Sequence, residues 1–152
     1  MATQWTAQGI TSGAVLPAAT LQSIGAAWES YTPTVKAGAT TLTGTVNTAR
    51  YCQIQKTVIL QVLFTVSNTG AANGIISVSY PVSLTPATAT NRPIGSFFVQ
   101  DTGTAFYVGI ATAQNPSQGL GYGSNNNMGA NSPALTIVAN DVIGIEVTYE
   151  VA

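Results

Sequence analysis

Alternation of apolar and polar residues is strongest at the C-terminal end of the chain. In "DVIGIEVTYEVA", residues 141–152, every second position from Ile143 onward carries an apolar side chain. A period of two places these side chains on one face of a β-strand and the intervening residues on the other face. We therefore predict a final strand with one core face and one solvent face. The core face is Ile143, Ile145, Val147, Tyr149 and Val151, and the solvent face is Gly144, Glu146, Thr148 and Glu150.

The segment "TVILQVLFTV", residues 57–66, also alternates, but it carries apolar residues on both faces. Because the second face is half apolar, we expect a strand that is covered on both sides, with another subunit as one candidate for the second cover. The preceding "ARYCQIQ", residues 49–55, predicts a partner strand, joined by a tight turn at Gln55 and Lys56. The first face of 57–66 is Val58, Leu60, Val62, Phe64 and Val66, and the second is Ile59, Gln61, Leu63 and Thr65.

Two further segments contain strands next to turn residues. "GIISVSYPV", residues 74–82, predicts a strand that ends at Pro81, because proline has no N–H to donate to a neighbouring strand. "IGSFFVQDTGTAFYVGIATA", residues 94–113, predicts a hairpin around "DTG", where Gly103 can adopt a positive φ. About eight short strands separated by turns favour an all-β fold over residues 28–152, an antiparallel β-sandwich of jelly-roll type.

Residues 1–27 differ from the rest, since they are rich in Ala, Thr, Ser and Gly with isolated large apolar residues. Pro17 suits the first turn of a helix, and Leu21, Ile24 and Trp28 recur on one helical face. We predict an extended arm with a short helix. So short an arm cannot bury its own large side chains, so we expect these to contact a partner surface. They are Trp5, Leu16, Leu21 and Ile24.

Glycine and asparagine dominate residues 114–133, "QNPSQGLGYGSNNNMGANSP". A loop of roughly twenty residues in a compact domain is usually functional or poorly ordered. Tyr122 with Asn125, Asn126 and Asn127 combines an aromatic face with amide groups, which suits the binding of a neutral glycan. An ordinary surface excursion or a lock between subunits is the alternative interpretation.

The chain is nearly uncharged. Charged residues are 6 % of the sequence, against about 25 % in ordinary globular domains, so much of the surface is neutral or is buried against partner chains. A net charge of −1 provides no basic stripe for nucleic acid and favours self-association. The lone Cys52 excludes an internal disulfide and suits a small apolar filler in a strand. We expect no signal peptide and no membrane insertion, because no long apolar run is present.

The sequence contains no recognisable catalytic constellation. It has no histidine, the commonest general base and metal ligand. Glu146 and Glu150 would lie roughly 13 Å apart along a strand, which is too far for a glycosidase pair. Asp101 and Asp141 adjoin turn residues, so we predict turn formers and not calcium ligands. We therefore predict a protein without enzyme activity, cofactor or metal.

Four phrases follow one another along the chain. "AAWESYTPTV" at 26–35 has a Trp-x-x-Tyr-x-Pro pattern, and "GTVNTARYCQIQKTVILQVLFTV" at 44–66 has a Tyr-x-Gln-Ile-x-Lys-Thr-Val strand pair. "IISVSYPVSLTPA" at 75–87 and "ANDVIGIEVTYEVA" at 139–152 follow them. In this order the phrases resemble a domain of tailed-bacteriophage virion proteins, found at the C-terminus of tail-fibre, tail-spike and head-fibre chains.

The resemblance implies a jelly-roll-like domain that forms a homotrimer on the phage particle, assembled in the host cytoplasm. Fibre proteins carry a shaft before this domain, and here only 1–27 precede it. We therefore expect a capsid decoration or head-fibre protein whose arm binds the major capsid protein. Trp28 and Tyr31 would form the junction and cap the bottom of the core. The family has glycine at the position of Gln55, so we expect a different turn type there, because other residues disfavour positive φ.

Two other functions remain open from the sequence. A tail-fibre or tail-tip receptor-binding protein would contact tail or baseplate proteins and bind host surface glycans, with the segment around Tyr122 as the candidate contact. A non-viral adhesin or bacteriocin component is the third possibility.

Overall fold

The computed structural model describes residues 27–67, 72–81, 86, 94–115, 118–122 and 135–151. Within these residues every regular element is a β-strand and all neighbouring strands pair antiparallel, which confirms the predicted all-β antiparallel fold. This part of the chain has no helix that could cross a membrane. The strands are β1 Glu29–Ser30, β2 Val35–Ala37, β3 Thr40–Thr41, β4 Gly44–Ile54, β5 Thr57–Val66, β6 Ala72–Asn73, β7 Ile76–Ser79, β8 Ile94–Asp101, β9 Ala105–Asn115, β10 Gln118–Tyr122, β11 Thr136–Ile137 and β12 Val142–Glu150.

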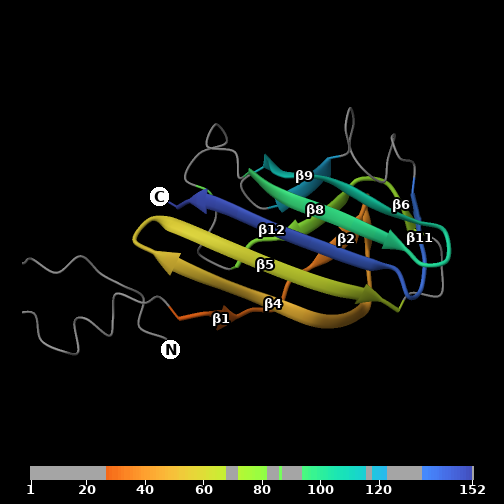
Figure 1. Cartoon of the computed structure of the whole chain (residues 1–152), viewed down its shortest axis with the longest axis horizontal. Helices are drawn as coiled ribbons and strands as arrows, with labels where there is room; N and C mark the ends of the chain where they lie inside the picture. The colour runs from red at the N-terminus through yellow and green to blue at the C-terminus, as the bar shows by residue number, and fades with distance from the viewer. Residues whose placement is uncertain are drawn as a thin grey trace, which may run out of the picture.

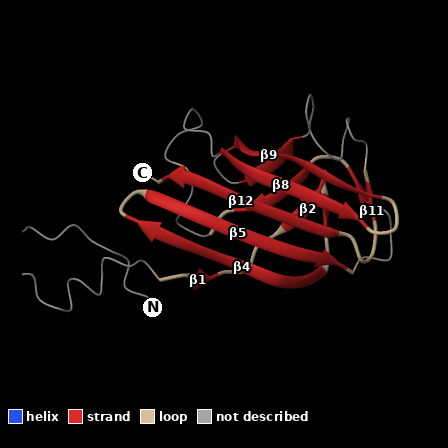
Figure 2. Cartoon of the chain, in the orientation of Figure 1, coloured by secondary structure: helices blue, strands red, loops and turns tan. Residues whose placement is uncertain are grey.

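Ten of the described strands form one continuous sheet, in the order β1-β4-β5-β12-β8-β9-β10-β7-β2-β3, and β11 pairs with β6 in a second sheet. The long strands β4, β5, β12 and β8 lie side by side in front, with β2 behind them (Figure 1). Strands make up most of the described chain in this view, with loops and turns between them (Figure 2). Buried residues of β5, β8 and β12 share one core cluster with those of β2 and β7. The sheet therefore curves round a single core.

The two alternating segments behave largely as predicted. The inner face of β5 and the alternating apolar residues from Ile143 to Val151 are all at most 6 % exposed, and Glu146, Thr148 and Glu150 are exposed. Gly144 lies on the outward face as predicted, but it is buried and not wet. The Phe98 ring covers it, and a Cβ there would collide with that ring. The other face of β5 is half-buried within the chain, and its cover by a second subunit stays a prediction.

The predicted turns are confirmed, with one surprise in geometry. β4 and β5 are joined at Gln55 and Lys56, β8 and β9 at a turn where Gly103 has a φ of 85°, and β7 ends before Pro81. Gln55 itself has a φ of 55°. The expectation that a non-glycine residue avoids a positive φ at this position is therefore wrong. The Gln53 side chain donates a hydrogen bond to the Gln55 carbonyl at 2.6 Å, which helps to hold the turn.

The prediction of one long loop over residues 114–133 is wrong for the first part of that segment. β9 continues to Asn115, and β10 lies between β9 and β7. Glycine-rich segments are poor strand formers, but Gly119 pairs with Ala113 on one side and Val78 on the other. Backbone hydrogen bonding on both sides overrides the weak propensity.

Short elements escaped the sequence pattern. The pattern predicted about eight strands, whereas the described residues contain twelve, five of them only two or three residues long. A period of two cannot be recognised over so few residues. The short strands β1 and β3 form the two edges of the large sheet. Next to β1, β4 carries a bulge at Asn47, because Val46 pairs with Phe64 and Thr48 with Leu63.

Candidate functional site

The outward surface of β4, β5, β12, β8 and β9 is the most distinctive face of the described molecule. Its side chains stand in cross-strand rows, because the register pairs Arg50 with Gln61, Gln61 with Glu146, and Glu146 with Ser96. Ser96 in turn pairs with Ile110 on β9. Residues paired directly on one face contact each other, so each row forms a continuous strip of surface. The row that starts at Arg50 and Gln61 changes from polar on β4 and β5 to apolar at Ile110 on β9.

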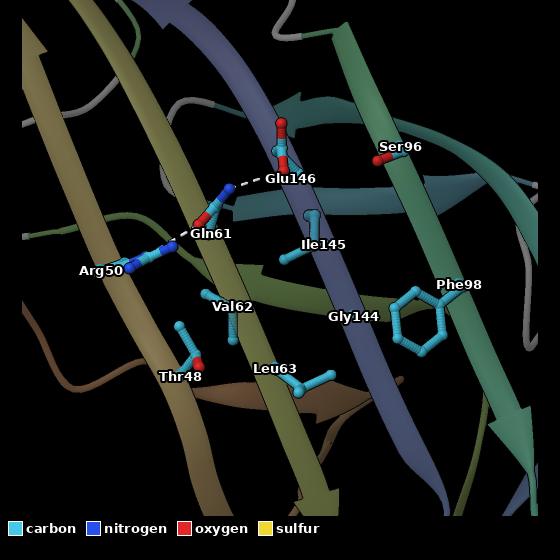
Figure 3. A pocket seen from close by; sticks show the side chains of 10 residues that line it. All are labelled: Thr48, Arg50, Gln61, Val62, Leu63, Ser96, Phe98, Gly144, Ile145 and Glu146. Carbon is cyan, nitrogen blue, oxygen red and sulfur yellow. Dashed lines mark hydrogen bonds between the residues drawn. The ribbon is translucent and has the colours of Figure 1, made fainter.

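Three residues of the first row form a hydrogen-bonded chain, which we call the polar ladder: Arg50, Gln61 and Glu146. The Arg50 Nε donates to Gln61 Oε1 at 2.9 Å, and Gln61 Nε2 donates to Glu146 Oε2 at 2.8 Å (Figure 3). The guanidinium carbon lies 4.4 Å from the centre of the Trp28 ring, a cation–π contact. The Gln61 amide thus links the Arg50 guanidinium to the Glu146 carboxylate and fixes the orientation of both groups.

A hollow of about 280 Å³ lies beside the polar ladder, and we call it the Gly144 groove. Figure 3 shows Leu63 on one side of Gly144 and Phe98 on the other, and the Phe98 ring lies where a side chain at position 144 would stand. The middle of the groove is apolar, and the ladder residues with Ser96 and Thr48 form a polar rim. The lining residues are Thr48, Arg50, Gln61, Val62, Leu63, Ser96, Phe98, Gly144, Ile145 and Glu146.

The apolar end of the surface is a row on β9, which we call the β9 ridge: Phe106, Val108 and Ile110. These side chains are 59 %, 70 % and 59 % exposed, the highest values among the large apolar residues of the described chain. The Phe106 ring stacks on Phe98 with the ring centres 5.1 Å apart, which connects the ridge to the groove. A continuous apolar patch of this kind is typical of a surface that contacts another apolar surface.

The predicted junction residues face opposite sides of the sheet. Tyr31 packs against the core, donates its backbone N–H to Ala49 O at 3.1 Å, and donates its hydroxyl to Ser79 O at 3.2 Å. Trp28 is 42 % exposed and lies against Arg50. Residues three apart on an extended chain point to opposite faces, so the expectation that both cap the core is wrong for Trp28.

Tyr31 belongs to a group of tyrosines at this end of the core. Its ring meets Tyr51 edge-on, and Tyr80 lies 4.9 Å from Tyr149. A hydrogen bond from the Tyr51 hydroxyl to Glu29 at 2.6 Å raises the pKa of Tyr51 to about 12. Burial raises the pKa values of Tyr31, Tyr80 and Tyr149 well above their usual range. These hydroxyls therefore stay neutral at physiological pH.

A second hollow, of about 570 Å³, lies next to the tyrosines. Ser30, Thr32, Thr34, Ser79 and Pro81 complete its lining with Tyr31, Tyr51 and Tyr80. The Tyr80 hydroxyl is buried without a hydrogen-bond partner in the described structure. This hollow contains hydroxyl groups but no group suited to acid–base or nucleophilic chemistry at neutral pH.

The acidic residues have structural positions. Asp141 is fully buried, and its carboxylate accepts hydrogen bonds from Thr102 N at 2.9 Å and Val138 N at 2.8 Å. The Asp101 carbonyl accepts from Thr104 N at 3.0 Å across the β8–β9 turn. The turn role predicted for Asp141 is confirmed, whereas Asp101 stands at its turn through a backbone contact. Among the described residues no group of three His, Cys, Asp or Glu side chains could hold a metal ion, and Cys52 is buried in β4 as predicted.

Several predicted contact residues cannot be placed. The anchors Trp5, Leu16, Leu21 and Ile24 and the run Asn125–Asn127 lie outside the described residues, as does the predicted short helix. Tyr122 ends β10, where its backbone pairs with Ile110.

Sequence reasoning missed the β9 ridge. The signal was available, because "AFYVGI" at 105–110 is apolar at consecutive positions and so cannot bury both faces in a sheet with one core. Tyr107 takes the core side.

The arrangement is suited to binding an apolar surface and offers no catalytic chemistry in the described residues. Comparison with known proteins adds nothing to this conclusion, since no protein-family model, no curated protein and no solved structure matches the chain.

Proposed function

We propose that this chain is a non-enzymatic structural protein of a tailed-bacteriophage particle, acting as a trimeric capsid decoration or head-fibre protein. In this proposal residues 28–152 form a jelly-roll-like sandwich, and three copies assemble on the particle surface. The resemblance of the phrases at 26–35, 44–66, 75–87 and 139–152 supplies the virion context.

The observation that carries the proposal is the exposed β9 ridge on a nearly uncharged chain. An enzyme or a small-molecule carrier does not need such a surface, whereas a protein that works in an assembly does. With four Lys or Arg against five Asp or Glu, copies held close together repel each other little.

The N-terminal arm would supply attachment to the major capsid protein. β1 pairs with β4 through Glu29 and Ser30, so the chain enters the domain along the β4 edge. Burial of each large arm side chain, Trp5, Leu16, Leu21 or Ile24, contributes roughly 1.5–3 kcal/mol. Three linked arms then bind more tightly than one, because binding of the first arm raises the effective concentration of the other two at their own sites.

Immunogold labelling of intact parent virions, with antibody raised against residues 28–152, tests the proposal. Gold over the head is the expected result. Gold confined to the tail tip would replace head decoration by a tail-fibre or receptor-binding role. Virions that stay unlabelled while the denatured particle proteins also lack the chain on an immunoblot would overturn the virion assignment.

A further inference from the structure

We propose that Asn73 is a site of spontaneous covalent modification, at which the side-chain amide is lost and aspartate or isoaspartate takes its place. Asn73 is the last residue of β6, and Gly74 follows it in the connection to β7. The reaction needs only water and no enzyme, particle or partner, so it is independent of the proposed function.

The chemistry is an attack of the main chain on the neighbouring side chain. The Gly74 backbone nitrogen loses its proton and bonds to Cγ of Asn73, the C–N bond of the side-chain amide breaks, and ammonia leaves with the proton. The product is a five-membered succinimide ring, which water then opens. Cleavage between the ring nitrogen and Cγ gives aspartate, and cleavage between the nitrogen and the main-chain carbonyl carbon gives isoaspartate.

The glycine at position 74 makes this asparagine reactive. Glycine has no Cβ, so it hinders closure of the ring less than any other residue. Asn73 is the only asparagine of the chain that precedes a glycine. Gly74 has a φ of 111°, a conformation that other residues rarely adopt, so the fold itself requires the residue that favours the reaction.

The structure leaves the site accessible. Asn73 is exposed, so water can reach its amide and ammonia can leave, and no hydrogen bond to another described residue holds its side chain. β6 pairs with β11 only through Asn73 with Thr136 and Ala72 with Ile137. So short a pairing opens at small free-energy cost, and opening frees the Asn73 backbone to bring Cγ to the Gly74 nitrogen.

The modification would act where two turns touch. Gly38, in the β2–β3 turn, packs against Gly74 so closely that a Cβ on Gly74 would lie 2.8 Å from the Gly38 Cα. The Gly38 N–H also donates to Ile75 O at 2.9 Å. Isoaspartate inserts an extra carbon atom into the main chain between residues 73 and 74, and this contact has no room for it. We therefore expect the β2–β3 turn to separate from the β6–β7 connection, and each converted copy to gain a negative charge.

Ageing of the purified full chain in neutral buffer at physiological temperature tests the site. Digestion and mass spectrometry should show the mass change of amide-to-acid conversion at residue 73, and enzymatic methylation specific for isoaspartate should label the same peptide. Asn47 is the matched control within the same molecule, because it is also exposed but precedes the β-branched Thr48 and bonds to Thr65 Oγ1 at 2.8 Å. We expect conversion at Asn73 to be at least about tenfold faster than at Asn47.

Two variants separate the modification from other changes on ageing. Asn73→Gln should fold like the wild type, because the position is exposed. It should lose the conversion, because the longer side chain must close a less favourable six-membered ring, and its melting temperature should not change on ageing. Freshly purified Asn73→Asp carries the new charge without the extra backbone atom. It should melt close to the fresh wild type and above the isoaspartate form isolated by ion exchange.

Three results would overturn the inference. Conversion of residue 73 in the urea-unfolded chain but not in the folded chain would show that the β6–β11 pairing protects it. Conversion at Asn47 as fast as at Asn73 would show that Gly74 has no influence. An isoaspartate form that melts like the fresh wild type would exclude the expected loss of contact between the two turns. None of these results affects immunogold labelling, so the proposed function stands or fails separately.

Discussion

Replacement of Asp141 by alanine should destabilise the fold more than any other single change at a turn. Asp141 is fully buried where the chain enters β12. Its two carboxylate oxygens accept hydrogen bonds from Thr102 N, in the β8–β9 turn, and from Val138 N, just after β11. One side chain therefore connects the turn before β12 to the β8–β9 turn, 39 residues away in the sequence.

The size of the effect follows from the groups left behind. Alanine would leave two backbone N–H groups without an acceptor. Each such group costs about 1–3 kcal/mol when buried, and the cost here lies at the low end because Thr102 and Val138 are exposed residues whose N–H groups water can reach. A combined loss of about 2 kcal/mol is still a large share of the 5–15 kcal/mol stability of a typical domain. At about 2–4 °C per kcal/mol for a chain of this size, we expect the melting temperature to fall by about 4–8 °C.

Thermal and urea unfolding followed by circular dichroism measure this loss. Asp101→Ala is the matched control, because the described contact of Asp101 is made by its backbone carbonyl, and we expect a change below about 1 kcal/mol. Asp141→Asn should lie between the two, since one amide oxygen can still accept. If Asp141→Ala and Asp101→Ala melted within a degree of each other, the argument from unpaired N–H groups would be wrong.

Three further changes can be tested with the same protein. Gln55→Gly should raise the free energy of unfolding by about 0.5–1 kcal/mol in urea titrations. Glycine adopts a positive φ without steric cost, and the greater entropy of the unfolded glycine chain offsets only part of this gain. A loss of stability would contradict this reasoning. The Tyr51 pKa is raised to about 12 by its bond to Glu29, above the ordinary value near 10. The folded state therefore holds this proton more tightly, so its stabilising contribution is complete below about pH 10 and is lost as the pH rises through about 12; Tyr51→Phe should flatten this part of the stability–pH profile, and an unchanged profile would refute the assignment. Deletion of residues 1–24 should leave the melting temperature within a few degrees and abolish sedimentation with particles, whereas undiminished binding would exclude the arm as the anchor.

The parts of the fold that could be predicted are those for which the residues of a single strand or turn carry the whole signal. β12 alternates because one of its faces is core and the other is wet, so the sequence alone identifies its buried residues, Gly144 excepted. The hairpin turn at Gly103 was predictable for a similar local reason, since the turn needs a positive φ that glycine supplies.

The rest depends on neighbours that are distant in sequence. Gly144 is buried only because Phe98 from β8 lies over it. β10 is a strand because β9 and β7 pair with its backbone on both sides. The glycine-rich sequence of this segment does not predict that pairing. The polar ladder draws one residue from each of three strands, and only the pairing register brings them into a row. The β9 ridge was visible as an excess of apolar residues, but deciding which face is exposed requires knowing where the core lies.

The edges of the large sheet limit how this chain can polymerise. Among the described residues, β1 pairs with two residues of β4, and β4 is interrupted further along by the bulge at Asn47. β3, at the opposite edge, is itself two residues long. A growing fibril adds strands by backbone hydrogen bonds along a long, regular edge, and short or bulged edges resist this addition. A nearly uncharged protein has little electrostatic protection against such growth. The irregular edges would therefore allow many copies to accumulate at high local concentration without forming fibrils. Contacts between copies would then be made by side chains and not by backbone strand pairing.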